Sequence, residues 1–412
     1  MIVQRSEQHI IKKSNRYYPM LDDFCFKSKN LYNHAMYTVR KEFIFSGKWI
    51  RYQDLDRLLK LDMDYPDYRN MPTAQSAQQL LKVLDNTWKS FFKSIKDCSK
   101  HRDKYLGRPN LPKYLKKSSR TVLILTNQNV RLVGDILMFP KTFNGLTLNP
   151  QCIYKDNFKL IQQVRFVPKS NHIIAEVIYN VEIPDEVISD NGRYMSIDLG
   201  IDNLATIAYN FGESPVIING KGLKSINQYY NKYLAYYQSI AKMHNGLHQT
   251  NRISRLTTKR NRKISDGIHK ISRYIINEAI RNNACTIIIG YNKEWKQLSE
   301  MPKQINQKFV QMPFSQLIQR IEYKAQEVGI KVIQTEESYT SGTSFLDREV
   351  PIKEFYNKHR RIHRGLFKSN AGKLINSDVN GSLQIMKKVF PDAYGSYGIE
   401  GVVLHPVKVN VC

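Results

Sequence analysis

The spacing of apolar residues changes along the chain, and the predicted secondary structure changes with it. In the first twelve residues, apolar pairs flank a polar centre, which indicates a strand over residues 1–12. From about residue 17 to residue 100 the apolar residues recur at helical spacing. The last of these helices begins after Pro72-Thr73 and carries Leu81, Leu84 and Trp88 on one face. We therefore predict one strand followed by a small helical domain.

Short apolar runs separated by turn residues follow the helical segment. The stretch 107–117, GRPNLPKYLKK, contains prolines that prevent regular structure, so its basic side chains project from a stiff loop. Beyond it, runs such as TVLIL from Thr121 and HIIAEVIYNV from His172 predict short strands with turns between them. This pattern favours an antiparallel barrel or sandwich, as in oligonucleotide-binding folds, which the N-terminal strand would complete.

Strands and helices alternate after Asn191-Gly192. Three strands in a meander precede two long helices over roughly residues 225–283, and a strand, a helix, a strand and a final helix follow. This is the element order of the RNase H type of nuclease core. In that order the first, fourth and fifth strands are neighbours, so carboxylates at their C-terminal ends converge on one place.

Composition points to a large polyanion as the partner. The 412 residues carry a formal net charge of +27 and predict more than one domain. Nucleic acid is favoured over a membrane surface, because no run approaches the roughly 18 apolar residues of a spanning helix. The N-terminus lacks the apolar core of a signal peptide, so we expect a cytoplasmic protein, associated with the nucleoid in a prokaryote. The five cysteines form no C-x-x-C pair and indicate neither disulfides nor a cysteine zinc site.

Basic and amide side chains are the candidates for nucleic-acid contact. In the second long helix, eight lysines and arginines between Arg252 and Arg273 stand against one acid, Asp266. A solvated face is the ordinary explanation of such a run, but so little compensation favours a surface that follows a nucleic-acid backbone. Glutamines after Thr73 are suited to reading base edges, with a solvated helix face as the alternative. The candidates are Gln78, Gln79, Lys82, Arg108, Lys113, Lys116, Lys117, Arg255, Lys259, Arg260, Arg262 and Lys263.

Two aspartates have the placement that metal-dependent phosphodiester cleavage needs. Asp198 lies in a short apolar strand, RYMSIDLG, where the alternative is a residue that caps a turn. Asp378 lies in NSDVNG at the opening turn of the last helix, where aspartate is also a common helix start. Two-metal cleavage uses several carboxylates that hold Mg²⁺ ions about 4 Å apart.

Four segments resemble the RuvC-type nuclease of the transposon-encoded TnpB family, which is ancestral to type V CRISPR effectors. They are IDLGIDNLAT, the WKQ and NQKFVQMPF run from Trp295, ESYTS from Glu337, and RGLF with INSDVNGSL from Arg364. The likeness covers essentially the whole chain. It implies an RNA-guided DNA endonuclease, monomeric in its ribonucleoprotein, with an omega-type guide RNA from the transposon end. The DNA target is double-stranded and lies beside a short motif, and two Mg²⁺ ions support the cut.

The resemblance also implies a multidomain α/β fold. It comprises an RNase H-like (RuvC) core, an oligonucleotide-binding-like wedge barrel and a helical recognition domain. The expected divisions are a wedge-barrel strand (1–14), the helical recognition domain (15–103), the wedge β-barrel (104–190), the first part of the nuclease (191–341), a target-nucleic-acid-binding insertion (342–366), and the second part of the nuclease with the C-terminal tail (367–412). The insertion contains no cysteine, so no zinc ribbon is expected there.

One departure from the family bears directly on activity. Most relatives carry a glutamate at the end of the fourth strand, where this chain has Gly290, and Glu294 is expected to point elsewhere. Glu336 and Glu337 lie at the end of the fifth strand. One of them could replace the missing glutamate as a metal ligand, and the alternative is that both are solvated loop acids. Successive side chains of an extended segment face opposite ways, and the E-x-x-T-S spacing of related eukaryotic nucleases favours Glu337.

The expected catalytic and metal-binding set is therefore Asp198, Glu337 and Asp378. Two other functions stay open at this point. One is a nuclease-inactive, RNA-guided DNA-binding repressor of the same family. The other is a guide-free transposase with the same core.

Overall fold

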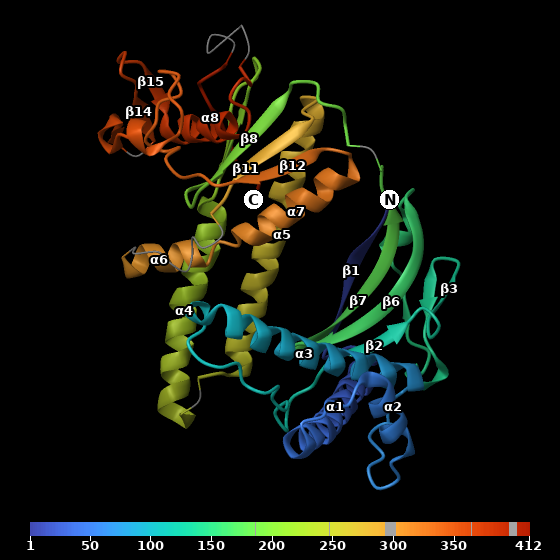
Figure 1. Ribbon diagram of the computed structural model, residues 1–412. Helices are drawn as coiled ribbons and strands as arrows, with labels where there is room; N and C mark the ends of the chain where they lie inside the picture. Colours follow the sequence, from blue (N-terminus) through green and yellow to red (C-terminus); the bar gives the residue numbers. More distant parts are fainter. Residues whose placement is uncertain (186, 247, 293–301, 364, 395–401) are drawn as a thin grey trace. The chain divides into compact units, whose positions relative to one another are not determined.

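The computed structural model describes residues 1–185, 187–246, 248–292, 302–363, 365–394 and 402–412. It divides into two compact units, Ile2–Glu182 and a second one made of Met1 with Ile183–Cys412 (Figure 1). Each unit has its own hydrophobic core, and each is described by itself.

Three helices follow the N-terminal strand of the first unit: α1 (Tyr18–Ser46), α2 (Tyr52–Leu61) and α3 (Ala74–Lys100). The predicted start of α3 is confirmed, because the Thr73 hydroxyl accepts a hydrogen bond from the Ser76 amide and the two residues form a capping box. Trp88 of α3 is fully buried and its ring packs edge-on against Phe43 and Phe91. The helical character predicted for residues 17–100 is therefore confirmed.

The strands of the first unit form two sheets rather than one barrel. The larger antiparallel sheet has the order β1-β7-β6-β2, with β1 (Ile2–Lys12) and β2 (Leu123–Thr126) at its opposite edges. The long hairpin of β6 (Phe158–Pro168) and β7 (His172–Glu182) forms its centre. The smaller sheet contains β3 (Arg131–Val133), β4 (Ile136–Met138) and β5 (Thr147–Leu148). The predicted strands are confirmed, but the closed barrel is not, because these short strands pair with one another instead of bridging the edges.

The central sheet of the second unit has the order β12-β11-β8-β9-β10-β16. The meander is β8 (Tyr194–Leu199), β9 (Asn203–Tyr209) and β10 (Val216–Asn219), and β16 (Val407–Val409) adds in parallel to β10. On the other side β8 pairs in parallel with β11 (Thr286–Gly290), and β11 with β12 (Lys331–Thr335). The prediction that the first, fourth and fifth strands are neighbours is confirmed.

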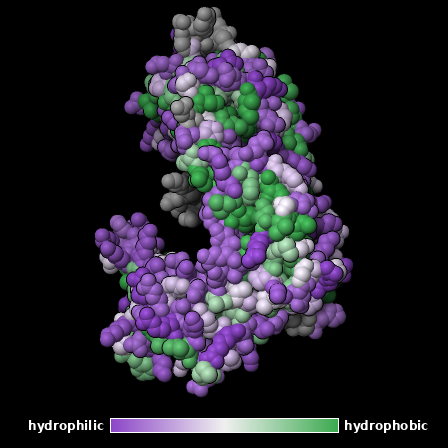
Figure 2. Space-filling view, turned by 90° about the vertical axis from the view of Figure 1, so that its right-hand side faces the viewer, coloured by the Kyte–Doolittle hydropathy of each residue, from purple (hydrophilic) through white to green (hydrophobic). Residues whose placement is uncertain are grey.

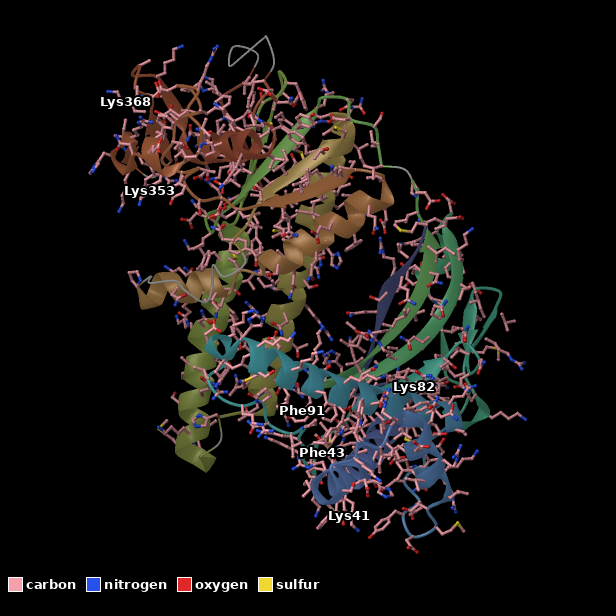
Figure 3. The ribbon with its side chains drawn as sticks, viewed as in Figure 1. Lys41, Phe43, Lys82, Phe91, Lys353 and Lys368 are labelled. Carbon is pink, nitrogen blue, oxygen red and sulfur yellow. The ribbon has the colours of Figure 1, made fainter. Side chains whose placement is uncertain are left out.

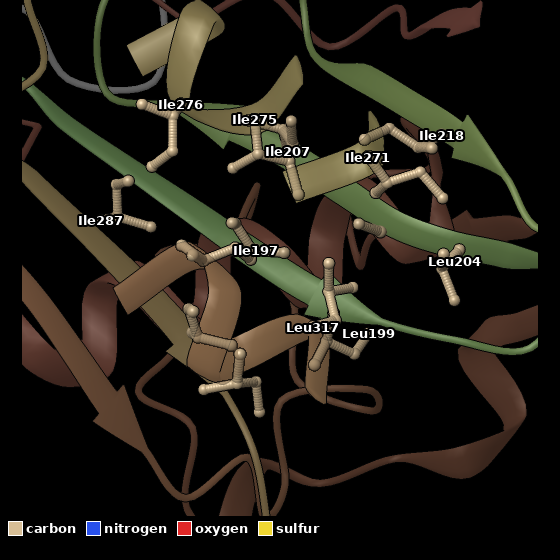
Figure 4. Close-up of a cluster of buried hydrophobic side chains, with 14 of the residues drawn as sticks. Ile197, Leu199, Leu204, Ile207, Ile218, Ile271, Ile275, Ile276, Ile287 and Leu317 are labelled. Carbon is tan, nitrogen blue, oxygen red and sulfur yellow. The ribbon is translucent and has the colours of Figure 1, made fainter. Parts of the chain in front are cut away.

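Helices cover both faces of this sheet. Alternate residues of β11 point to opposite faces of the sheet. Ile287 and Ile289 belong to the large core with α5 (Asn251–Arg281) and α7 (Phe314–Glu327), shown in Figure 4. Ile288 packs on the other face against Ile385 of α8 (Ser377–Val389). The remaining helices are α4 (Lys221–Asn245) and α6 (Lys303–Val310). The multidomain α/β architecture expected from the sequence is therefore present.

A small antiparallel sheet lies between β12 and α8 in the chain. Its strands are β13 (Arg361–His363), β14 (Leu366–Lys368) and β15 (Leu374–Asn376). The carboxylate of Glu349 holds this segment together, because it pairs with Arg360 at 2.5 Å and accepts the Ser344 amide at 2.8 Å. Short 3-10 turns complete the two units: η1 (Arg102–Lys104), η2 (Lys141–Phe143), η3 (Gln151–Tyr154), η4 (Lys353–Phe355) and η5 (Lys358–Arg360).

Candidate active site

Asp198 stands near the C-terminal end of β8, on the face that α8 covers. Its carboxylate lies directly against Gly381 of α8: a Cβ added to Gly381 would stand 3.1 Å from Oδ2. A glycine at this point lets the helix approach the carboxylate closely. Burial raises the pKa of Asp198 well above its usual range, the charges of Glu337 and Asp378 raise it further, and Arg361 opposes them.

Asp378 lies in the first turn of α8 but does not cap the helix. Asn376 is the cap, since its side-chain oxygen accepts the amides of Asp378 and Val379. The Asp378 carboxylate instead accepts hydrogen bonds from Asn203 Nδ2 at 2.7 Å and from Arg361 Nη2 at 3.1 Å. Asp378 is therefore an acid of the first turn but not the capping residue, and its side chain is held in a polar cluster beside β9.

Glu337 follows β12 and turns inward, whereas Glu336 turns out. Glu336 has a side chain that is 62% exposed and an ion pair with Lys388. Among the described residues, Glu337 Oε2 is buried and has no hydrogen-bond partner. Burial raises the pKa of Glu337 to about 7, Lys388 acts against this shift and Glu336 adds to it. The solvated-acid explanation therefore describes Glu336 and not Glu337.

The Glu337 carboxylate lies next to Gly290, at the end of β11. A Cβ added to Gly290 would stand 3.1 Å from Glu337 Oε2 and only 2.5 Å from Ile385 Cδ1. The space where a side chain at position 290 would begin is thus filled by the glutamate of the next strand and by α8. Glu294, the other acid considered near this strand, lies outside the described residues.

The three carboxylates line one cavity of about 1030 Å³, together with several basic side chains. Arg361 and His363 enter it from β13, and Lys221 and Lys224 from the start of α4. These four residues were not predicted as site residues. The run KHRRIHR is visibly basic, but only the fold brings it to the end of β8. The lining residues that carry charge or imidazole groups are Asp198, Asp202, Lys221, Lys224, Glu337, Arg361, His363, Asp378 and Lys408.

The donor set fits a hard divalent cation. Carboxylate oxygens are the ligands that Mg²⁺ prefers. Glu337 Oε2 is buried without a hydrogen-bond partner among the described residues, and the pKa of Asp198 is raised, so the ionised form of each carboxylate is unfavourable here. A bound cation would stabilise both ionised carboxylates. Within the described part of the chain, no three Asp, Glu, His or Cys side chains already converge closely enough to hold one ion. Arg361 supplies the positive charge that pairs with Asp378 in this arrangement.

The predicted nucleic-acid contacts occupy different environments. Arg108, Lys113, Lys116 and Lys117 are exposed on the loop before β2, as are Arg255, Lys259, Arg262 and Lys263 on α5. Lys82, labelled in Figure 3, is exposed on α3 with its ammonium 5.2 Å from the Tyr52 ring centroid, and Gln79 is half-buried. Hydrophilic residues cover much of the face that Figure 2 shows.

Two of these candidates already have partners inside their own unit. Gln78 hydrogen-bonds the Tyr68 side chain. Arg260 donates to Asn227 Oδ1 at 2.8 Å and to the Gln311 carbonyl at 3.2 Å, so it ties α5 to α4 and to the segment after α6. A change at either residue therefore affects packing as well as any ligand.

Comparison with known proteins identifies the family. Residues 178–296 match a model described as a probable transposase, and residues 314–385 match the Cas12f1-like TNB domain. The first range contains Asp198, and the second contains Glu337 and Asp378. The TnpB-like protein ORF457 of Acidianus two-tailed virus is 24% identical over 426 residues, which is 92% of this chain and 83% of that protein. The chain belongs to the TnpB family.

A solved structure shares the fold of this TnpB-family chain. It is the Cas12f1 protein in a Cas12f1–sgRNA–target DNA complex, with a TM-score of 0.55 and 16% identity, covering 89% of this chain and 81% of that one. The family resemblance expected from the sequence motifs is therefore confirmed, and so is the Cas12-like fold. No helix among the described residues is both long and apolar enough to cross a membrane.

Proposed function

We propose that this TnpB-family chain is an RNA-guided DNA endonuclease of a transposon that cuts DNA by two-metal chemistry at Asp198, Glu337 and Asp378. The observation that carries the proposal is the placement of the Glu337 carboxylate. It lies buried against Gly290, in the same cavity as the two aspartates. A family member that had lost cleavage would have no reason to keep three partly buried carboxylates around one cavity.

The side chains around the cavity have distinct parts in this proposal. Asp198, Glu337 and Asp378 would hold magnesium, which when bound supplies an activated hydroxide and stabilises the leaving oxygen. Asn203 and Arg361 fix the orientation of Asp378 through the two hydrogen bonds to its carboxylate. The Arg361 guanidinium also suits a phosphate oxygen of the bound strand, since it carries more donors than Asp378 uses.

The orientation of Glu337 depends on groups outside the carboxylate set. The Asn292 side chain accepts the Glu337 amide at 3.2 Å and fixes the backbone where β12 ends. Lys388 of α8 pairs with Glu336 and also donates to the Ser338 carbonyl at 3.3 Å, so both neighbours of Glu337 are tied to the helix. Glu337 is thereby left to face the cavity.

The proposed partners are a guide RNA from the transposon end and a double-stranded DNA target beside a short motif, bound by a monomer. The net charge of +27 supports contact with many phosphates. On α3 we assign motif reading to Gln79 with Lys82 beside it, because Gln78 is already bonded to Tyr68. Arg255, Lys259, Arg262 and Lys263 are assigned to the backbone of the nucleic acid.

The test combines RNA identification with cleavage. RNA that copurifies with the protein is sequenced, and the reconstituted ribonucleoprotein is then given a plasmid with a matched target and a library of adjacent sequences. Glu337→Gln should abolish Mg²⁺-dependent cleavage and leave target binding nearly intact, whereas the control Glu336→Gln should cut like the wild type.

Each alternative function has its own outcome in this experiment. Target binding without cleavage by the wild type, under every adjacent sequence, would identify an RNA-guided repressor. Heterogeneous copurifying RNA together with strand transfer would identify a guide-free transposase. Full cleavage by Glu337→Gln would show that the glutamate has another role.

A further inference from the structure

Helix α4 presents a row of tyrosines on its surface. Tyr229 and Tyr236 are 55% and 57% exposed, and Tyr233 lies between them, half-buried. The ring centroids of Tyr229 and Tyr233 are 4.5 Å apart. Tyr237 borders them, with its ring centroid 6.0 Å from that of Tyr233 and 5.3 Å from that of Tyr236. We call Tyr229, Tyr233 and Tyr236 the tyrosine row.

The tyrosine row is not the packing face of α4. Tyr230, one position on from the first member, points toward α5, and its hydroxyl is 3.2 Å from Thr257 Oγ1. Asn231 exchanges side-chain hydrogen bonds with Gln311 at 2.9 and 2.7 Å. Since each residue turns the helix by about 100°, Asn231 and Tyr229 point to nearly opposite sides. The row therefore lies on the side of α4 turned away from Gln311, and core packing does not account for it.

The surroundings of the row are basic throughout. Helix α4 contains four lysines, Lys221, Lys224, Lys232 and Lys242, and its sequence contains no aspartate or glutamate. Lys232 is exposed next to Tyr233, and the Arg252 guanidinium lies 4.3 Å from the Tyr237 ring centroid. Aromatic rings beside cations, on a helix whose own sequence has no acid, are suited to a polyanion that carries flat apolar groups. This is the chemistry of an unpaired nucleic-acid strand.

The start of α4 connects the tyrosine row with the candidate active site. Lys221 and Lys224 line the cavity that contains Asp198, and Tyr236 follows Lys221 by fifteen residues, about 22 Å along the helix. A strand that leaves the cavity along α4 therefore meets the tyrosines in succession. We propose that the tyrosine row stacks against unpaired bases of single-stranded DNA, on the strand that enters the active site. This inference rests on the proposed function, because it takes the cavity to be the place where DNA is cut.

The test separates base stacking from phosphate binding. Fluorescence anisotropy measures binding of the full chain to oligo(dT), to oligo(U) and to an abasic DNA of equal length. The same series is measured for Tyr229→Leu/Tyr233→Leu/Tyr236→Leu, which keeps apolar bulk, and for the corresponding triple phenylalanine variant, which keeps the rings. Tyr37→Leu is the control, because Tyr37 is also 55% exposed on a helix.

The wild type should bind oligo(dT) more tightly than the abasic strand, by roughly fivefold or more for each stacked base. The leucine variant should lose this preference and keep its affinity for the abasic strand, while the phenylalanine and Tyr37→Leu variants should resemble the wild type. Equal wild-type affinity for the two DNAs, or a preference that survives in the leucine variant, would overturn the inference. A base preference seen only with oligo(U) would overturn the assignment to DNA. None of these measurements uses guide RNA or cleavage, so failure of the proposed nuclease is detected separately.

Discussion

Replacing Gly290 by alanine should impair cleavage without removing any chemical group from the site. The added Cβ would stand 2.5 Å from Ile385 Cδ1, where carbon atoms in contact are ordinarily about 3.5–4.0 Å apart, so an overlap of about 1 Å must be relieved. Ile385 is fully buried on α8, so its side chain must repack among its neighbours. Overpacking of this kind costs roughly 1–3 kcal/mol of stability.

The same methyl group would also press on the proposed catalytic glutamate. It would lie 3.1 Å from Glu337 Oε2, and either the carboxylate or strand β11 must shift. A displacement on the order of 1 Å in an active site can lower the rate about 100-fold, and the 3.1 Å contact asks the carboxylate to move by only a fraction of that. We therefore expect Gly290→Ala to cut roughly 3- to 10-fold more slowly, with target binding unchanged.

A second variant separates the two effects. Ile385→Val removes the Cδ1 atom and by itself costs about 0.5–1.5 kcal/mol. In Gly290→Ala/Ile385→Val the contact with Cδ1 is gone and the contact with Glu337 remains, so thermal stability should recover more than cleavage does. Gly107→Ala is the matched control, because a Cβ there meets no atom within 4 Å.

The assay is single-turnover cleavage of a matched plasmid by the reconstituted ribonucleoprotein, with target binding and melting temperature measured in parallel. If Gly290→Ala folds and cleaves within twofold of the wild-type rate, then the Glu337 carboxylate is not confined by Gly290, and the reasoning is refuted.

Three further predictions use other parts of the chain. Arg262→Glu/Lys263→Glu should weaken guide-RNA binding. It should also reduce the slope of log affinity against log salt by about 1.4, which is about 0.7 for each lost phosphate contact. An unchanged slope would show that this face of α5 is only solvated. Gln79→Ala should relax the preference for the target-adjacent motif in a library cleavage assay by about 1–3 kcal/mol, as expected for one base contact, and an intact preference would contradict the assignment. Burial lowers the pKa of Lys324 to about 8 in the folded chain, with Arg273 and Arg320 adding to the shift. The unfolded chain then binds more protons between about pH 8 and pH 10, so stability rises with pH there. Lys324→Met should flatten this rise in melting temperature, and a parallel rise in the variant would exclude Lys324 as its source.

Much of the fold could be predicted because its signals are local. Apolar spacing located β8, β11 and β12, and the rule for parallel strands then made their C-terminal ends neighbours. The barrel was not confirmed, since closure depends on which strands pair, and β3, β4 and β5 are too short for their sequence to specify partners. Arg361 and Lys221 were missed for the same reason, because only the tertiary fold brings β13 and the start of α4 to one cavity.

The register of the sheet explains why the second of two adjacent glutamates turns inward. Ser196, Ile288 and Ile333 are paired across β8, β11 and β12, and Ile288 packs toward α8, so all three side chains share the α8 face. Two residues farther along, Asp198, Gly290 and Thr335 stand level on that same face. The next residue with this parity is Glu337, just beyond the end of β12, while Glu336 has the opposite parity and is exposed.

The carboxylate then has to reach back from two residues beyond the level of Gly290, because Gly290 pairs with Thr335. Neighbouring strands are about 4.8 Å apart and successive residues about 3.3 Å apart, so the extended glutamate side chain points diagonally back toward Gly290. Its Oε2 does so, since it ends beside the bare Cα of Gly290. A glutamate lost from one strand can thus be replaced from the adjacent strand only if the lost residue becomes small and the new one keeps the parity of the face. Glycine at 290 and glutamate at 337 satisfy both conditions at once, as the proposed relocation of the glutamate requires.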